Sequence, residues 1–436
     1  MKESKILEKL LDLGRKIIPR SLFRTAQPVY HFLLGIIGVI IYRFPAKKLK
    51  VIGVTGTKGK SSTTEIINSI LESAGKKTAL ANTIRYKILD KEWRNMFKMT
   101  LRGRFFTQSF LRKALNAGVE YAIIEISSEG VRQFRHKFLE LDALVFTNLS
   151  PEHIESHGSY RNYVNAKLDI AKELENTNKK DPAIIVNIDD QEAPKFLELN
   201  IKNKIPYSLD NAFGVKTDEN GSSFQIDKVV IHSNLGGVFN IYNMLGAISC
   251  VKHFGISTEE SKLGIEKIKS IRGRMEKVDE GQNFEVVVDY AHTKESLEAI
   301  YKTYASKKTI CILGNTGGGR DKWKRKIMAE TADSYCDEII LTNEDPYEED
   351  PQKIIDDMKV GIKNKPLEVI LDRRKAIRSA VEKAHKLSIS SDKEVAILIT
   401  GKGTDPYIME AGGKKTPWDD AEVVREELQK LNARIT

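Results

Sequence analysis

The sequence predicts an α/β fold in which a central P-loop-type domain with a mainly parallel sheet precedes a smaller Rossmann-like C-terminal domain. After residue 48, short apolar runs typical of strands alternate with helical stretches. Such alternation predicts a parallel sheet covered by helices. A loop rich in glycine and lysine follows the first run, and a second alternating series begins after residue 271. The two series therefore predict two α/β domains in one chain.

The first series lies between residues 48 and 270. Its runs are apolar without polar alternation, which indicates strands covered on both faces. Two of its helical stretches end at glycine, Gly75 or Gly118, a residue that accepts the left-handed conformation at a helix end. The expected strands are residues 50–55, 77–82, 121–127, 143–148 and 182–187, and the expected helices are 60–74 and 105–117.

The second series follows "IRGRMEKV" at 271–278 and has the pattern of a doubly wound domain. Its expected strands are 284–290, 308–314, 338–343 and 394–400, and its expected helices are 294–304, 322–335, 373–386 and 419–431. We therefore divide the chain into an N-terminal apolar segment (1–47), a central domain (48–270) and a C-terminal domain (271–436).

The composition is that of an ordinary soluble globular protein of 436 residues with a net charge of +10. Acidic and basic residues are interspersed and no nucleic-acid recognition motif accompanies the charge, so we expect anionic small molecules rather than nucleic acid as partners. Cys250, Cys311 and Cys336 form no CxxC pair, which excludes a Cys-rich zinc ribbon. We expect three ordinary buried thiols in a cytoplasmic protein.

Residues 29–44, "VYHFLLGIIGVIIYRF", are nearly all apolar and are flanked by basic residues. The run is shorter than the roughly 20 residues that a membrane span needs. It also lacks the cleavage site of a signal peptide. Two alternatives stay open: a helix packed on the central domain, which we favour, and a helix in peripheral contact with the inner membrane face.

The glycine-rich loop joins the strand expected at 50–55 to the helix expected at 60–74. Glycine lets backbone N–H groups approach a phosphate, a helix N-terminus adds positive potential, and a lysine and a serine serve the terminal phosphates and magnesium. The general P-loop spacing would place glycine at 54, where this chain has Val54, so the loop is a variant. The candidate nucleotide-binding residues are Gly56, Thr57, Lys58, Gly59, Lys60, Ser61 and Ser62.

The loop "GVTGTKGKSS" (53–62) resembles that of the Mur ligase family, and further segments resemble it in the same order. They are "IIEISSEG" (123–130), "FTNLSPEHIESHGSYRNYVNAK" (146–167), "VFNIYN" (238–243), "GRME" (273–276), "VVDYAHTKESL" (287–297), "GGGRDKWKR" (317–325) and "GKG" (401–403). The MurE-like branch is the most similar. Several motifs in sequence order are far more specific than any one of them.

The resemblance implies an ATP-dependent, ADP-forming amide ligase of peptidoglycan synthesis. Such an enzyme phosphorylates a substrate carboxylate to an acyl phosphate, and the amine of an amino acid then displaces the phosphate. The implied cofactors are ATP and Mg²⁺, and the implied partners are a UDP-N-acetylmuramoyl-peptide acceptor and a free amino acid. Phosphoryl transfer between anions needs positive charge and positioning above all.

The resemblance also implies the catalytic and metal-binding residues. Lys60 and Arg274 would reach the phosphates. Ser61, Glu125 and His153 would hold metal ions, and Lys167 would be carbamylated by CO₂ and support the same site. Each of these residues taken alone is more often an ordinary polar side chain, and the surrounding motif reverses that expectation.

The same resemblance assigns the nucleotide's base and ribose. Asn240 or Asn243 would read the adenine edge, with Asn187 and Asp189 as weaker candidates. Asp289 would meet the ribose at the end of a strand. The remaining candidates are His292, which would frame that region, and Lys322, a second phosphate contact. Because several of these residues lie after 270, domain closure would have to complete the site.

The sequence departs from the family pattern where substrates other than ATP would bind. Only about 48 residues precede the central domain, too few for the usual uridine-binding domain of about a hundred residues. Thr100, Arg102 and Arg104 stand in the expected substrate loop. Tyr347 replaces an arginine that grips diaminopimelate in the family, beside Asp345, and Asp405 replaces a glutamate. This acidic pocket would favour a cationic amino acid such as lysine.

Two other functions compete with this one. The first is a folylpolyglutamate-synthase-like or other peptide-adding ligase with a different acceptor. The second is a non-ligase ATP-binding subunit, against which Lys60, Glu125, His153 and Lys167 argue.

Overall fold

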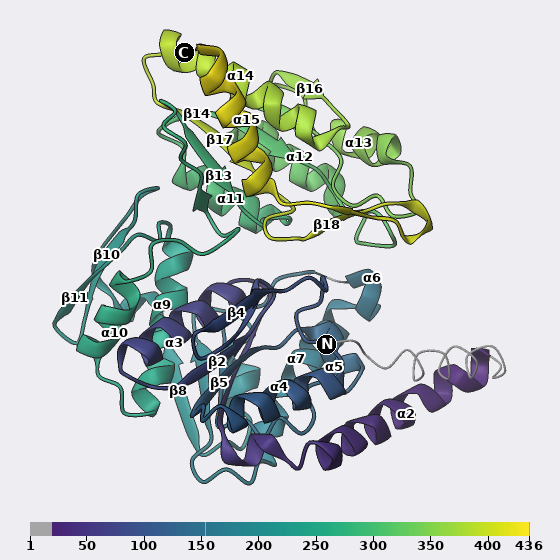
Figure 1. Cartoon of the computed structure of the whole chain (residues 1–436), viewed down its shortest axis with the longest axis vertical. Helices are drawn as coiled ribbons and strands as arrows, with labels where there is room; N and C mark the ends of the chain where they lie inside the picture. Colours follow the sequence, from purple (N-terminus) through teal and green to yellow (C-terminus); the bar gives the residue numbers. More distant parts are fainter. Residues whose placement is uncertain (1–19, 153, 436) are drawn as a thin grey trace.

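The computed structural model describes residues 20–152 and 154–435, which form two α/β lobes and a long N-terminal helix (Figure 1). The larger lobe contains an eight-stranded sheet of order β4-β3-β2-β5-β1-β6-β7-β8. Six of these strands run parallel, and β3 and β4 form an antiparallel edge. The strands are β1 (Lys50–Thr55), β2 (Thr78–Ala81), β3 (Arg85–Ile88), β4 (Lys91–Arg94), β5 (Tyr121–Glu125), β6 (Ala143–Phe146), β7 (Ala183–Asn187) and β8 (Asn203–Tyr207). The mainly parallel central sheet is confirmed.

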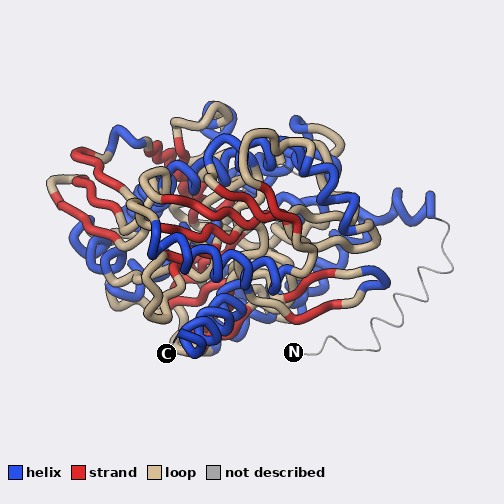
Figure 2. The backbone as a smooth tube through the Cα atoms, turned by 90° about the horizontal axis from the view of Figure 1, so that it is seen from above, coloured by secondary structure: helices blue, strands red, loops and turns tan. Residues whose placement is uncertain are grey.

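Helices pack on both faces of this sheet, and Figure 2, which views the molecule from above, shows helices around the strands. Alternate residues of β1 belong to different cores, because Val51 packs with α4 and α7 on one face and Ile52 packs with α3 and α9 on the other. The helices are α3 (Lys60–Ser73), α4 (Arg104–Asn116), α5 (Ser128–Arg132), α6 (Ile154–His157), α7 (Tyr160–Glu175), α8 (Ala193–Leu197), α9 (Val238–His253) and α10 (Thr258–Glu266). The predicted helices at 60–74 and 105–117 correspond to α3 and α4.

A small antiparallel sheet lies beside α9 and α10 and was not predicted. Its strands are β9 (Phe213–Thr217), β10 (Ser222–Ile226) and β11 (Val229–Ser233). Phe224 and Ile231 from this sheet join the core around α9. The sheet carries the turn around Glu219 toward the second lobe.

The smaller lobe contains a mixed sheet of order β12-β13-β17-β14-β15-β16, in which only β12 is antiparallel. The strands are β12 (Glu276–Lys277), β13 (Glu285–Val288), β14 (Lys308–Leu313), β15 (Glu338–Leu341), β16 (Leu367–Val369) and β17 (Val395–Ile399). The helices are α11 (Lys294–Thr303), α12 (Lys324–Tyr335), α13 (Pro351–Lys359), α14 (Arg373–Ser390) and α15 (Asp420–Ile435). A hairpin of β18 (Tyr407–Met409) and β19 (Lys415–Pro417) extends from this Rossmann-like lobe.

The N-terminal helix α2 (Arg20–Ile41) packs against α4. Arg112 of α4 fixes its end, donating hydrogen bonds to the carbonyl oxygens of Tyr42 (2.9 Å) and Arg43 (2.8 Å). One face of α2 therefore packs on the central domain, as the favoured prediction stated. Across the described residues, no helix combines the length and apolar character that crossing a membrane requires.

Two cysteines correct the prediction of three free thiols. Cys311 in β14 and Cys336 after α12 form a disulfide with a Cα–Cα distance of 6.2 Å, and Cys250 is a buried free thiol. The pairing arises because β14 and β15 are neighbours in the sheet, so the chain returns to β14 at the start of β15. The spacing of the cysteines in the sequence carries no trace of this contact.

Candidate active site

A cavity of about 690 Å³ lies between the two lobes. The larger lobe, which we call the middle lobe from here on, contributes the glycine-rich loop and segments that follow β2, β5, β6 and β7. The smaller lobe contributes segments that follow β13, β14, β15 and β17. Ligands of open α/β sheets bind at the carboxyl ends of parallel strands, and here two such edges face one another.

The loop before α3 has a backbone that requires glycine at two positions. Gly56 and Gly59 have φ values of +145° and +78°, a range that other residues rarely adopt. A Cβ atom on Gly59 would lie 2.2 Å from Asn243 Oδ1, and one on Gly56 would lie 2.0 Å from Thr147 Oγ1. Lys60 begins α3 and its Nζ donates to the carbonyl oxygen of Thr57 (2.8 Å). The loop therefore places a lysine and a helix N-terminus at the cavity wall.

Glu125, Ser61 and Arg274 meet beside this loop. Ser61 Oγ donates to Glu125 Oε2 at 2.9 Å, and the same carboxylate oxygen accepts from the backbone N–H of Thr83 at 2.8 Å. Arg274 Nη2 lies 3.3 Å from Ser61 Oγ. The structure thus brings together three predicted residues that are separated by 64 and 149 positions along the chain.

Lys167 lies directly behind the loop and is almost completely buried. Its Nζ donates to the carbonyl oxygen of Gly56 (2.7 Å) and to Thr55 Oγ1 (3.3 Å). Burial, and next the positive charge of Lys60, hold the pKa of Lys167 well below its usual value. A buried lysine with a lowered pKa carries a neutral, reactive amine.

His153 lies outside the described residues, so its metal-binding role stays a prediction. The preceding Glu152 is described, and its Oε1 lies 2.7 Å from His292 Nε2. His292 belongs to the other lobe and lines the cavity, as predicted for a residue that frames the site. The pair joins the two lobes.

The candidate base- and ribose-binding residues surround one end of the cavity. Asn243, Asn187, Asp189 and Asp289 line it. Asn240 lies behind Asn243, accepting a hydrogen bond from it at 3.1 Å and donating to the carbonyl oxygen of Gly236 at 2.8 Å. Burial raises the pKa of Asp289, even though its carboxylate accepts from two backbone N–H groups and faces Arg274. Of the two predicted asparagines, only Asn243 faces the cavity.

Two other residues predicted for the site, Lys322 and Arg102, are not among those that line the cavity, and their roles stay predictions. Lys322 turns away from the cavity to pair with Glu349 at 3.1 Å, and Lys324 lines the cavity in its place, with its Nζ 3.2 Å from the carbonyl oxygen of His292. Arg102 is buried with its guanidinium carbon 3.3 Å from the centroid of the Phe97 ring. Because it is held among aromatic rings, Arg102 does not line the cavity.

The expected substrate loop otherwise reaches the cavity. Thr100 lines it and shares a hydrogen bond of 2.9 Å with Thr83. Arg104 is the first residue of α4. Its role in substrate binding stays a prediction.

The predicted acidic pocket contains two lysines of the protein itself. Asp345, Tyr347 and Asp405 line the cavity, as does Lys98 from the middle lobe. Lys98 Nζ lies between the two carboxylates, in contact with Asp345 and 2.8 Å from Asp405 Oδ2. Lys402 Nζ contacts Asp345 Oδ1 from the other side at 2.8 Å. Two carboxylates and two ammonium groups balance one another.

Sequence reasoning missed Lys98, Arg135, Arg320 and Lys324, which all line the cavity. Arg320 and Lys324 belong to the "GGGRDKWKR" motif, which pointed to this region but not to these side chains. Lys98 lies two residues before Thr100 in the substrate loop, and only the docking of the lobes reveals its partners.

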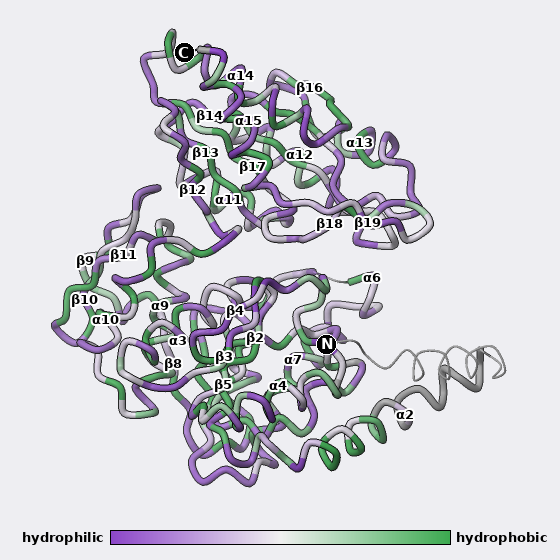
Figure 3. The backbone as a smooth tube through the Cα atoms, viewed as in Figure 1, coloured by the Kyte–Doolittle hydropathy of each residue, from purple (hydrophilic) through white to green (hydrophobic). Residues whose placement is uncertain are grey.

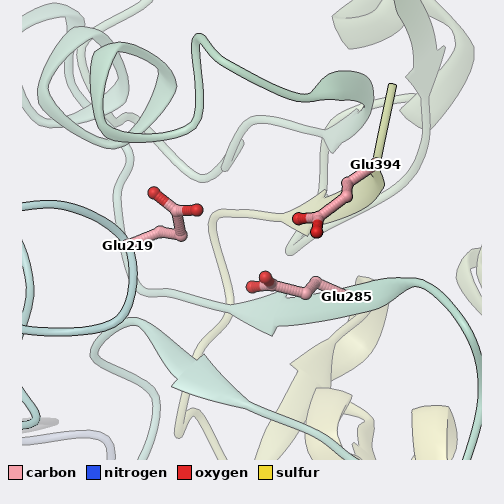
Figure 4. Close-up of side chains that lie close together, drawn as sticks. All are labelled: Glu219, Glu285 and Glu394. Atoms are coloured by element: carbon pink, nitrogen blue, oxygen red, sulfur yellow. The ribbon is translucent and has the colours of Figure 1, made fainter. Parts of the chain in front are cut away.

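A separate cluster of carboxylates lies at the lobe junction. Glu219, Glu285 and Glu394 point toward one another (Figure 4) in an arrangement that could hold a metal ion. Lys307 Nζ lies 3.2 Å from Glu219 and 2.8 Å from Glu394, and also contacts Glu285. The ammonium group of Lys307 therefore already provides the cation among these carboxylates.

Comparisons with known proteins decide the family. Residues 54–251 match the Mur ligase middle domain, and residues 273–403 match the Mur ligase glutamate ligase domain. The chain belongs to the Mur ligase family. It is therefore an ATP-dependent amide ligase of peptidoglycan synthesis.

Two curated relatives bear the same name, UDP-N-acetylmuramoyl-L-alanyl-D-glutamate–2,6-diaminopimelate ligase. The Bacillus cereus protein is 33% identical over 409 residues, covering 91% of this chain and 81% of the relative. The Fusobacterium nucleatum protein is 36% identical over 413 residues, covering 91% of this chain and 80% of the relative.

Solved structures place this Mur ligase in the same fold. A diaminopimelate ligase of that name matches with a TM-score of 0.59 and 27% identity, covering 88% of this chain and 79% of the other. Mycobacterium tuberculosis folylpolyglutamate synthase complexed with ADP matches with a TM-score of 0.70 but only 14% identity, covering 86% and 93%. The second likeness shows a shared fold alone, so it does not favour the folylpolyglutamate alternative.

Proposed function

We propose that this Mur ligase joins a diamino acid to the peptide carboxylate of a UDP-N-acetylmuramoyl dipeptide in the cytoplasm. The names of its relatives give the acceptor, and the interlobe cavity supports the chemistry. The observation that carries the proposal is a single cavity whose walls include both the phosphate-binding loop and the Asp345–Asp405 pair. A carboxylate activated at the first can then meet an amine held at the second.

The residues around the loop fit ATP and magnesium. Carboxylate and hydroxyl oxygens are the hard ligands that Mg²⁺ prefers, and Glu125 and Ser61 provide them 2.9 Å apart. His153 is proposed as a further metal ligand. A bound Mg²⁺ would polarise the phosphoryl oxygens. Lys60 and Arg274 add fixed positive charge where the transferred phosphoryl group develops negative charge.

We assign Lys167 as the lysine that is carbamylated. Reaction with CO₂ needs a neutral amine, and burial lowers the pKa of this one. Its hydrogen bond to the carbonyl oxygen of Gly56 holds Nζ at the base of the phosphate-binding loop. Carbamylation would convert a neutral amine beneath the loop into an anion with release of a proton, and the anion would offset the positive charge of Lys60 and of bound metal.

The amino acid is the part of the proposal that this chain specifies most distinctly. The relatives are named for diaminopimelate, whereas Tyr347 in place of arginine favours an amino acid without a distal carboxylate. Both diaminopimelate and lysine carry a distal ammonium group. The Asp345–Asp405 pair, which already binds the ammonium group of Lys98, is the complementary site for it.

The test is ADP release by the full chain with ATP, UDP-N-acetylmuramoyl-alanyl-glutamate and one amino acid at a time. We expect release with diaminopimelate or lysine, none with alanine or norleucine, and an amide product in the mass spectrum. Release with norleucine equal to that with lysine would overturn the ammonium site while leaving the ligase proposal standing. ADP release that needs no amino acid would overturn the ligase proposal itself.

A further inference from the structure

The helix α2 presents an apolar face that no described part of the chain covers. The face consists of Leu33, Ile37, Ile40 and Ile41, which are between 46% and 57% exposed and which the helical spacing places on one side of α2. Phe44, which is 44% exposed, follows the end of the helix. Figure 3 shows the apolar end of α2 beside the middle lobe.

Near the C-terminal end of α2, its opposite face packs against α4. Gly35, Gly38 and Val39 are buried there. The Phe32 ring, between the two faces, contacts the rings of Phe134 and Phe138 at centroid distances of 6.3 and 5.7 Å. The packed face and the backbone bonds from Arg112 fix the helix, so the apolar face is held outward.

The charge around this face is entirely positive along the chain. Residues 20–64 contain no aspartate or glutamate. Arg43, Lys47 and Lys48 are exposed at the end of α2, and Lys47 Nζ lies 5.0 Å from the ring centroid of Phe44. Basic side chains beside an apolar helix face are typical of proteins that bind anionic lipid surfaces.

We propose that α2 and residues 42–48 dock this protein on an anionic lipid surface. The helix lies along that surface with Leu33, Ile37, Ile40 and Ile41 in the acyl region and with Lys47 and Lys48 at the headgroups. A second copy of the chain fits less well, because residues 20–64, which carry this face, contain no acidic side chain to meet the same basic residues. The inference does not depend on the amino acid or acceptor that the ligase uses.

Sedimentation of the full chain with lipid vesicles tests the proposal. We expect about tenfold more binding to phosphatidylcholine vesicles that contain phosphatidylglycerol than to phosphatidylcholine alone, declining as salt screens the charges. The double variant Ile37→Glu/Ile40→Glu should lose binding by at least about tenfold. The double variant Lys47→Glu/Lys48→Glu should lose the preference for the anionic lipid.

A matched control uses apolar residues of two other helices, α10 and α14, that are more exposed than Ile37 and Ile40. Leu263→Glu/Ile389→Glu changes residues 62% and 71% exposed and should bind vesicles like the parent. Circular dichroism and thermal melting verify that all variants are folded, whether or not they are active ligases. Failure of the parent to bind anionic vesicles, or parental binding by Ile37→Glu/Ile40→Glu, would overturn the proposal. A dimer in light scattering that this variant dissociates would assign the face to a second copy instead.

Discussion

The two ends of the interlobe cavity are built in different ways. At the end proposed to bind phosphate, which we call the phosphate end, Gly56, Gly59, Lys60 and Ser61 lie within six consecutive residues, and the conformation of one loop positions them all. At the end proposed to bind the amino acid, which we call the amino-acid end, Lys98, Asp345, Lys402 and Asp405 come from three distant segments and from both lobes. The first end is a property of local backbone, whereas the second exists only while the lobes are docked.

The largest effect should come from the phosphate end. Lys60→Ala removes the charge at the start of α3, and we expect ADP formation to fall by about 10²–10³-fold, as when one preorganised donor is lost. Lys77→Ala, an exposed lysine just beyond the same helix, is the control and should leave the rate unchanged. A loss smaller than about fivefold would remove Lys60 from the proposed catalytic group.

The next largest effect is expected at Lys167, the buried lysine beneath the glycine-rich loop. Lys167→Ala should lower activity by about 10²-fold, with partial recovery when short carboxylates replace the carbamate. Because the pKa of Lys167 is lowered, its amine stays neutral where a free lysine is protonated, so CO₂ uptake should be lost only as the pH falls through that lowered value. Lys172→Ala on the same helix α7 is the control. Unchanged activity in Lys167→Ala would contradict the assignment.

The amino-acid end should respond through substrate affinity. Asp405→Asn should raise the KM for the diamino acid by about tenfold, since a charged hydrogen bond is worth about 1.5–3 kcal/mol. Lys98→Met should lower that KM, because the substrate ammonium group no longer has to compete with the lysine for the two carboxylates. Lys91→Met, an exposed lysine on β4, is the control. Equal KM values for parent and both variants would show that this pair serves only to dock the lobes.

The docking of this end should also depend on pH. Burial alone would raise the pKa of Asp345, but Lys402 and Lys98 outweigh it and hold the pKa below its usual value. The carboxylate therefore contributes stability above the pKa of an unfolded aspartate, and the contribution is lost as the pH falls through the lowered folded value. Melting temperatures of the parent and Asp345→Asn should converge at acid pH.

A smaller effect distinguishes the cost of a positive φ at Gly59 from the cost of a steric clash there. Gly59→Ala and Gly75→Ala both place a side chain at positive φ, +78° and +73°, which costs about 1–2 kcal/mol. Only Gly59 also has a neighbour, Asn243 Oδ1, within 2.2 Å of the new Cβ atom, whereas Gly75 has open space. Urea unfolding should show the larger loss for Gly59→Ala, and only that variant should raise the KM for ATP. Equal losses would mean that Asn243 moves freely.

The smallest change is a count of reactive thiols in the whole chain. After unfolding without reductant, one thiol per chain should react with maleimide, Cys250, and three should react after reduction. Three reactive thiols before reduction would show that Cys311 and Cys336 are not linked.

The sequence predicted the regular alternation of strands and helices and the position of the segments that resemble the family motifs. The parallel strands and their helices followed from apolar runs and glycine stops, and the loop between β1 and α3 followed from its glycines and Lys60. The binding of phosphate by that loop stays a prediction. The small sheet β9–β11 escaped prediction because its strands mix polar and apolar residues and are partly exposed, as Phe213 is in β9. They lack the unbroken apolar runs by which the central strands were predicted.

Contacts between lobes were beyond sequence reasoning. Lys98 is an unremarkable lysine in the chain, and its position between Asp345 and Asp405 depends on how two domains meet. Lys322 and Lys324 differ by two positions, yet one pairs with Glu349 outside the cavity and the other lines it. The direction of a side chain in a loop is set by its neighbours in space.

Lys307 and the carboxylates of Glu219 and Glu394 join the two lobes on the side of β10, across the molecule from the β18 hairpin (Figure 1). If the lobes rotate about that point, displacement grows with the length of the lever arm. The hairpin side, where Asp345 accepts the backbone N–H of Met409, would then swing through the widest arc. Opening of the lobes during turnover would therefore widen the cavity most on the hairpin side and least near Glu219.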